Sequence, residues 1–392
     1  MEFVKQQNNS SPILFSWATS VLSLQQAQAF LQLQSFSARI PALSALFTTP
    51  QTPPWHGEGL TVADHLARMM AALELVCHDP QFLRLDVWQD HDLQLFIRDV
   101  QATCVRHKDL LLAFILTHDL AKAETVVLQG VSGSVGEREG FLGQHVVTMP
   151  ERERYLKLAR AVSLSKNDSA TLARQAFVQL NVHAHYPLHD RLGASAHYGE
   201  VRLAILRELT LDDSYARFLS TLIRLHIDAL SAWTDQLDVR RLQAFDAIAR
   251  HAGINVELFH DVLPACLLLD GVLGILQVRD GGFVVDASVI RHYFLSEREA
   301  FPQRHEKRLA GEKRVIRERV QGILERHDLS PVVLFRLLQT PVGPQRGEVM
   351  HEVYHALREE GYVPQLGAQT ETLLPRIARA RAEIIQEELP FL

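Results

Sequence analysis

The segment Leu110–Lys122, LLLAFILTHDLAK, is the most informative part of this sequence. Its first seven residues are apolar and predict a buried helix. His118 and Asp119 follow directly, and ionisable groups at the end of a buried helix are costly unless something compensates them. An imidazole and a carboxylate together can hold a divalent metal ion, and Lys122, one helical turn on, can balance the charge of a phosphate. The alternative is a surface helix end with an ordinary ion pair.

Helical periodicity continues on both sides of this segment. Apolar residues recur at spacings of three and four over residues 12–35, 60–77, 92–122, 151–180, 197–230, 238–252 and 257–277. Strand-like alternation is confined to Gly282–Val285, and the Gly-rich stretch Gly130–Gly143 is expected to be a flexible loop without a phosphate-loop motif. The sequence therefore predicts an all-α protein. We expect an N-terminal helical segment over 1–50, a main domain over 51–285 and a C-terminal helical tail over 286–392.

Composition narrows the class of protein. The 392 residues are 47% hydrophobic and 22% charged, which is enough for a sizeable core and argues against wholesale disorder. The net charge of −6 gives no overall nucleic-acid signal. The three cysteines are far apart, and Met1–Ser11 lacks the apolar core of a signal peptide, so we expect a cytoplasmic protein. The longest near-apolar stretch, Val262–Val278, is interrupted by Asp270 and is too short to span a membrane well.

Histidines are frequent, so no single one is strong evidence. The chain has 19 of them. The dipeptide His-Asp begins at His78, His91, His118, His189, His260 and His327. Of these six, only His118 directly follows a long apolar helical run, which is why context favours it.

Other polar residues in apolar surroundings accompany His118. His65 interrupts an apolar helical segment, His197 opens one amphipathic segment, and His226 closes another. A lone histidine of this kind is often a satisfied core residue. Asp270 lies inside Leu267–Leu273, where a buried carboxylate must be protonated, hydrogen-bonded or metal-bound. Asp228 is the rival carboxylate, and a hydrogen-bonded helix carboxylate is the alternative for Asp270.

The order of these residues resembles that of the HD superfamily of metal-dependent phosphohydrolases. Trp55-His56-Gly57-Glu58-Gly59, followed by His65, is similar to the Trp/Tyr-His-Pro-Glu-Gly and His motif in the HD region of bacterial tRNA nucleotidyltransferases and poly(A) polymerases. The hexapeptide THDLAK that contains His118 is similar to their Cys-His-Asp-Leu-Gly-Lys. Weaker similarities follow at Gly193–Glu200, in the Gly-Pro-x-x-Gly-like PVGPQRG of 341–347 and at Glu360-Gly361.

The resemblance runs from about residue 48 to 375, with gaps and three departures. Ala121 replaces the usual glycine. Insertions separate His65 from His118, and His118 from His197. The nucleotidyltransferase domain is missing, since the first 50 residues contain no aspartate at all. We therefore expect no nucleotide addition to RNA.

What the resemblance implies is an HD phosphohydrolase domain with insertions and a helical tail. Such a protein hydrolyses a phosphomonoester or a (cyclic) phosphodiester of a nucleotide or an RNA end, with one or two divalent ions of Mn, Ni, Mg, Fe or Zn. The alternatives are a non-catalytic RNA-binding module with the HD fold and a hydrolase of signalling nucleotides.

Roles follow for individual residues. The expected metal ligands are His65, His118, Asp119 and Asp270, with His197 and His226 as candidates for a second ion. The expected catalytic residues are His118, Asp119, Lys122, His197 and His226. The expected substrate-binding residues are His56, Glu58, Lys122, Arg304, Lys307 and Arg308. The last three belong to Arg291–Arg326, where ten Lys/Arg against six Asp/Glu give a local net charge of +4 and predict weak RNA binding or a solvated helix face.

Overall fold

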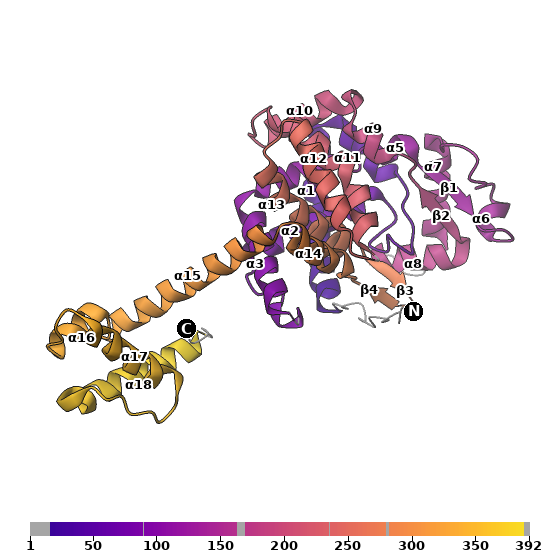
Figure 1. Cartoon of the computed structure of the whole chain (residues 1–392). Coiled ribbons are helices and arrows are strands. Elements are labelled where there is room, and N and C mark those ends of the chain that lie inside the picture. The colour runs from indigo at the N-terminus through magenta and orange to yellow at the C-terminus, as the bar shows by residue number, and fades with distance from the viewer. Residues whose placement is uncertain (1–15, 89, 163–168, 235, 280–281, 388–392) are drawn as a thin grey trace, which may run out of the picture. The chain divides into compact units, whose positions relative to one another are not determined.

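The computed structural model describes residues 16–88, 90–162, 169–234, 236–279 and 282–387 (Figure 1). The protein is 72% helical, with 18 α-helices and two small sheets among these residues, which confirms the predicted all-α class. The chain divides into two compact units, Met1–Pro302 and Gln303–Leu392. None of the described helices has the length and apolar character needed to cross a membrane.

The first unit contains most of the helices. They are α1 (Ser16–Arg39), α2 (Val62–His78), α3 (His91–Arg106), α4 (Lys108–Thr117), α5 (Lys122–Thr125), α6 (Val135–Arg138), α7 (Met149–Ala161), α8 (Ser169–Leu180), α9 (His189–Ala194), α10 (Gly199–Glu208), α11 (Tyr215–Thr234), α12 (Val239–His251), α13 (Val256–Leu267) and α14 (Ser288–Ala300). Short 3₁₀ segments cover Pro41–Thr48, Leu85–Val87 and Ala196–Tyr198, and a π-helical segment covers Leu268–Gly274.

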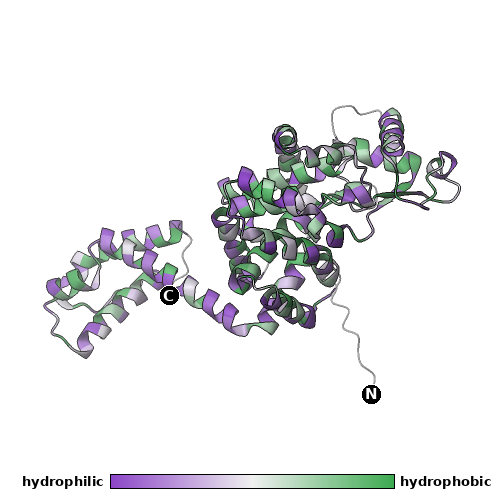
Figure 2. Ribbon diagram, turned by 90° about the horizontal axis from the view of Figure 1, so that it is seen from above, coloured by the Kyte–Doolittle hydropathy of each residue, from purple (hydrophilic) through white to green (hydrophobic). Residues whose placement is uncertain are grey.

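Helix α2 lies at the centre of this unit. Its N-cap is Thr61, whose backbone N–H and hydroxyl both donate to the Asp64 carboxylate. Most of its residues are buried, and it packs against α1, α3, α4 and the π-helical segment. A helix that is buried on nearly every face belongs to the core, and this one carries His65 into it. The hydrophobic and hydrophilic bands that alternate along the outer helices in Figure 2 are those of amphipathic helices.

Two antiparallel two-stranded sheets belong to the same unit. Strand β1 (Val127–Gly130) pairs with β2 (Val182–His185), and β3 (Gln277–Arg279) pairs with β4 (Gly282–Val284). The β1–β2 pairing closes the insertion that follows His118, and α6, α7 and α8 lie between the two strands in sequence. The insertion has an apolar cluster of its own, which includes Leu128, Tyr155 and Val182.

The second unit is a small helical body. It contains α15 (Pro302–Arg326), which begins one residue before the division, α16 (Pro331–Leu337), α17 (Pro344–Arg358), a 3₁₀ turn (Gly367–Gln369) and α18 (Thr370–Gln386). Its core is formed by residues such as Ile323, Leu334, Val353 and Leu373. The predicted tail was expected to start at residue 286, whereas α14 packs into the core of the first unit through Ile290 and Tyr293.

The structure differs from the predicted helices at several breaks. The helix expected over 92–122 is two helices, α3 and α4, which meet at His107, where φ is −117° and ψ is 31°. The Gly-rich stretch 130–143 contains the end of β1 and helix α6. There Gly136 approaches Val182 so closely that a Cβ atom would overlap the valine side chain.

Candidate metal centre

Five separate elements bring ionisable side chains to one place in the first unit. His65 comes from α2, His118 from the C-cap of α4, His189 from the first position of α9, His226 from α11, and Asp270 from the π-helical segment. Asp119 directly follows His118. All six are less than 9% exposed. We call these six residues the His–Asp cluster.

His65, His118 and Asp270 form the first group within the cluster. One ligand-type atom from each lies within 4.8 Å of the others. The Nε2 atom of His65 is 3.2 Å from Oδ1 of Asp270. The rings of His65 and His118 are 5.7 Å apart between centroids. The structure therefore brings His65, His118 and Asp270 together, as the sequence predicted. The rival carboxylate, Asp228, is exposed on α11.

Asp119, His189 and His226 form the second group, with the same 4.8 Å limit between ligand atoms. Asp119 stands between the two groups. Its Oδ2 atom is 3.3 Å from His118 Nε2 and 3.8 Å from His65 Nε2, while its Oδ1 atom is 3.5 Å from His189 Nε2. One carboxylate thus presents an oxygen to each group.

Three of the imidazoles are held in the same way. The Nδ1 atoms of His118, His189 and His226 hydrogen-bond to the backbone carbonyls of Ile115, Tyr186 and Ile223 at 3.1, 2.8 and 2.5 Å. A carbonyl oxygen only accepts, so each Nδ1 carries a proton and Nε2 is the nitrogen that faces the cluster. This is the orientation that backbone carbonyls impose on metal-ligating histidines.

The three Nε2 atoms and Asp119 Oδ1 are buried and have no hydrogen-bond partner among the described residues. An unsatisfied buried polar atom costs about 1–3 kcal/mol, so four of them would cost about 4–12 kcal/mol. That is comparable to the whole stability of a typical domain, about 5–15 kcal/mol. Since these atoms are all acceptors, a cation satisfies them together. The residues present therefore fit a bound divalent metal.

The electrostatics of the cluster favour positive charge at its centre. Burial, together with the nearby His118, lowers the pKa of His226 to about 3, so its imidazole is neutral. Burial alone would raise the pKa of the Asp119 carboxyl, but His118 and Lys122 outweigh it and hold the pKa well below its usual range. Burial disfavours a charge on His65, yet Asp270 and Glu58 raise its pKa to about 10. The site is thus strongly attractive to positive charge.

Lys122 lies at the edge of the cluster and is buried. Its Nζ atom is 2.7 Å from Asp119 Oδ2 and 4.8 Å from the centre of the Tyr186 ring. The expected proximity of His118, Asp119 and Lys122 is therefore present. The ammonium group neutralises part of the carboxylate charge.

The π-helical segment explains how Asp270 reaches His65. π-Helical turns are rare and are frequently found at functional sites. Here the wider turn comes after Pro264, which lies inside α13, and it places Gly274 against α2. A Cβ atom at Gly274 would lie 2.6 Å from both Leu269 O and Met69 Cγ, so only glycine fits. Arg68, on the next turn of α2, donates to Leu273 O at 2.8 Å and holds the segment in place.

One predicted ligand, His197, is not brought to the cluster, and three predicted substrate-binding residues belong to the other unit. His197 was expected to ligate a second ion, but its side chain is 58% exposed and its Nε2 pairs with Glu124 Oε1 at 3.1 Å. His197 belongs to a 3₁₀ turn that follows α9, and His189 occupies the place in the cluster that was predicted for His197. Arg304, Lys307 and Arg308 belong to α15 in the second unit, and Lys307 is exposed.

Sequence reasoning missed His189 as a site residue. It begins one of the six His-Asp dipeptides, but α9 has only six residues, too few to show helical periodicity. Its position depends on the β1–β2 pairing, which returns the chain to Asp119 after the insertion. The only local signal was the His-Asp dipeptide itself.

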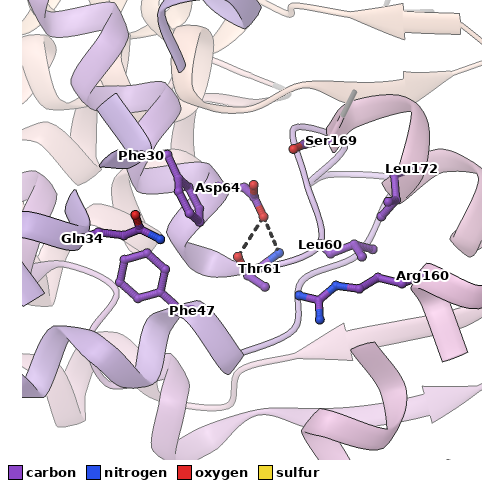
Figure 3. Close-up of a pocket in the computed structure, with 9 residues that line it drawn as sticks. All are labelled: Phe30, Gln34, Phe47, Leu60, Thr61, Asp64, Arg160, Ser169 and Leu172. Carbon is purple, nitrogen blue, oxygen red and sulfur yellow. Dashed lines mark hydrogen bonds between the residues drawn. The ribbon is translucent and has the colours of Figure 1, made fainter. Parts of the chain in front are cut away.

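A separate cavity of about 360 Å³ opens beside the first turn of α2 (Figure 3). It is lined by Phe30, Gln34, Phe47, Leu60, Thr61, Asp64, Arg160, Ser169 and Leu172. No member of the His–Asp cluster lines it. Asp64 neighbours His65 in sequence, but its carboxylate caps the helix through Thr61 in this cavity, as the dashed lines show.

Comparison of the chain with protein-family models, with curated proteins and with solved structures gave no match.

Proposed function

We propose that this protein is a metal-dependent phosphohydrolase of the HD type. The observation that supports it best is the convergence of three histidine Nε2 lone pairs and two aspartates at one buried place. The residues concerned also follow the order His, His-Asp, Asp on which the resemblance to the HD superfamily rests.

The two groups of the His–Asp cluster can each take one divalent ion, with Asp119 shared. His65, His118 and Asp270 would hold the first, and His189 and His226 the second. Imidazole and carboxylate donors suit Mn, Fe, Ni and Zn better than Mg, which prefers oxygen ligands. A divalent ion bound there supplies Lewis-acid chemistry, because it polarises a phosphoryl oxygen and makes water a stronger nucleophile at neutral pH.

The chain's own residues prepare the site for a phosphate group. Lys122 supplies a fixed positive charge next to Asp119. His56, whose side chain is 16% exposed, is the imidazole nearest to solvent around the cluster and is the residue we assign to contact with the substrate. Because the ligand atoms are buried, a terminal or cyclic phosphate reaches them more easily than an internal phosphodiester does. The proposed substrate is therefore a nucleotide or an RNA end.

Hydrolysis assays test this proposal. The purified chain is incubated with Mn²⁺, Ni²⁺ or Mg²⁺ and a panel of nucleoside monophosphates, cyclic nucleotides, signalling nucleotides and RNA ends. We expect release of phosphate or opening of a cyclic phosphate, lost in the double variant His118→Ala/Asp119→Ala. Full activity in that double variant would contradict the proposal. Metal binding without any hydrolysis would favour a non-catalytic module.

A further inference from the structure

Glu58 is the most thoroughly hydrogen-bonded carboxylate next to the cluster. It is 1% exposed, and its two oxygens lie within 3.2 Å of four nitrogen atoms. Its Oε1 atom lies 2.9 Å from His56 Nδ1, 3.1 Å from His65 Nδ1 and 3.2 Å from Gln51 Nε2. Its Oε2 atom accepts from the backbone N–H of Leu276 at 3.2 Å. Glu58 has no exposure left for a substrate, so the predicted substrate-binding role does not fit it.

The arrangement requires a carboxylate rather than an amide. A glutamine at position 58 would have to direct its NH₂ group either toward Leu276 N–H or toward the two imidazoles and Gln51. Either choice places a donor against a donor, whereas a carboxylate only accepts.

The contacts of His65 determine how its ring is turned. Nδ1 of His65 faces two acceptors, Glu58 Oε1 at 3.1 Å and Gly274 O at 3.2 Å. Nδ1 must then carry a proton, and Nε2 points the other way, to Asp270 Oδ1 at 3.2 Å and toward Asp119. Among the four histidines of the cluster, only His65 has a carboxylate beside its Nδ1. The Nδ1 atoms of the other three donate to backbone carbonyls.

We propose that Glu58 is a positioning residue that fixes the tautomer and ring orientation of His65 for metal ligation. This inference rests on the proposed metal site. A carboxylate bonded to a ligating histidine also makes that imidazole a stronger donor. The same carboxylate holds the His56 ring, whose centroid is 5.1 Å from that of His65, so one anion orders the metal ligand and its solvent-facing neighbour together.

Cobalt binding tests the role without measuring activity. Co²⁺ is titrated into wild type, Glu58→Gln, Glu58→Asp and Gln51→Ala, and both the affinity and the visible absorption spectrum are recorded. Loss of such a partner typically weakens metal binding about 10–100-fold. We expect this loss in Glu58→Gln, with an altered spectrum at saturation, and an intermediate loss in Glu58→Asp. Gln51→Ala is the matched control: it removes a buried partner of Glu58 that does not touch His65, so the affinity should stay at the wild-type value.

The outcomes separate this role from the metal site itself. Wild-type affinity and spectrum in Glu58→Gln would overturn the positioning role and leave the metal site standing. Equal weakening by Gln51→Ala would show that Glu58 only supports the local fold. If Glu58→Gln does not fold, unchanged binding by Glu58→Asp would overturn the role instead. A wild type that binds no Co²⁺ would overturn the metal site and this role with it.

Discussion

His189 is the member of the proposed metal site that only the structure brings into view, and replacing it by alanine is a demanding test of the cluster. The side chain is 8% exposed and makes one hydrogen bond, from Nδ1 to Tyr186 O at 2.8 Å. Without metal, His189→Ala should therefore lose only about 0.5–1.5 kcal/mol for that bond. The larger effect is expected when metal is present.

The magnitude follows from linkage between binding and folding. At a free metal concentration 100 times the Kd, binding adds about 2.7 kcal/mol to the free energy of unfolding. Loss of an outer-shell partner raises the Kd by up to about 100-fold, and we take the same factor for a direct ligand. The same metal concentration then equals the new Kd and adds only about 0.4 kcal/mol to the free energy of unfolding. The difference of about 2.3 kcal/mol corresponds to about 4 °C in Tm for a unit of this length, Met1–Pro302, at an unfolding entropy of about 2.1 cal/mol/K per residue.

The assay is thermal unfolding of the full chain in chelator and in excess Mn²⁺ or Zn²⁺. His197→Ala is the matched control, because His197 is exposed and pairs with Glu124 outside the cluster. We expect the metal-induced rise in Tm to shrink in His189→Ala and to be unchanged in His197→Ala. The reverse pattern, or a full metal response in His189→Ala, would refute the second group of ligands.

Three further outcomes are expected. Gly274→Ala forces a methyl group against Leu269 O and Met69, so the free energy of unfolding should fall by about 1–3 kcal/mol in urea titration, and an unchanged midpoint would speak against the close packing. Lys122→Met removes the ammonium partner of the buried Asp119 carboxylate and should cost up to about 3–5 kcal/mol in chelator, with part of the loss recovered on adding metal; equal losses with and without metal would count against a cation site. The basic segment 304–319 of α15 should give weak RNA binding that falls steeply as salt rises, and binding insensitive to salt would exclude phosphate contacts.

The sequence predicted site residues best where a charged side chain stands in apolar surroundings, because few structures make such a position stable. Asp270 lies inside an apolar run, and His118-Asp119 follows a buried helix. The charges at both places needed partners, and the structure brings the two places together in one cluster. Helical periodicity likewise predicted the all-α class. These inferences needed only local patterns, since burial of a helix face is visible in the spacing of its apolar residues.

Other features depended on contacts between distant residues. The position of His189 follows from the pairing of β1 with β2, and neither strand showed a pattern long enough to predict. The break at His107 lies inside the helical pattern predicted over 92–122, and the π-helical segment 268–274 lies inside the one predicted over 257–277. The contacts of Glu58 could not be predicted either, because its four nitrogen neighbours come from residues 51, 56, 65 and 276.

The most direct test of the central claim is to locate metal in a crystal. Crystals of the full chain grown with Zn²⁺ are measured at the zinc absorption edge, and an anomalous map is calculated. We predict an anomalous peak about 2.0–2.2 Å from an Asp119 oxygen and from histidine Nε2 atoms. If the site holds two ions, a second peak lies on the other side of Asp119. Anomalous peaks confined to surface histidines, with none in the His–Asp cluster, would contradict the account.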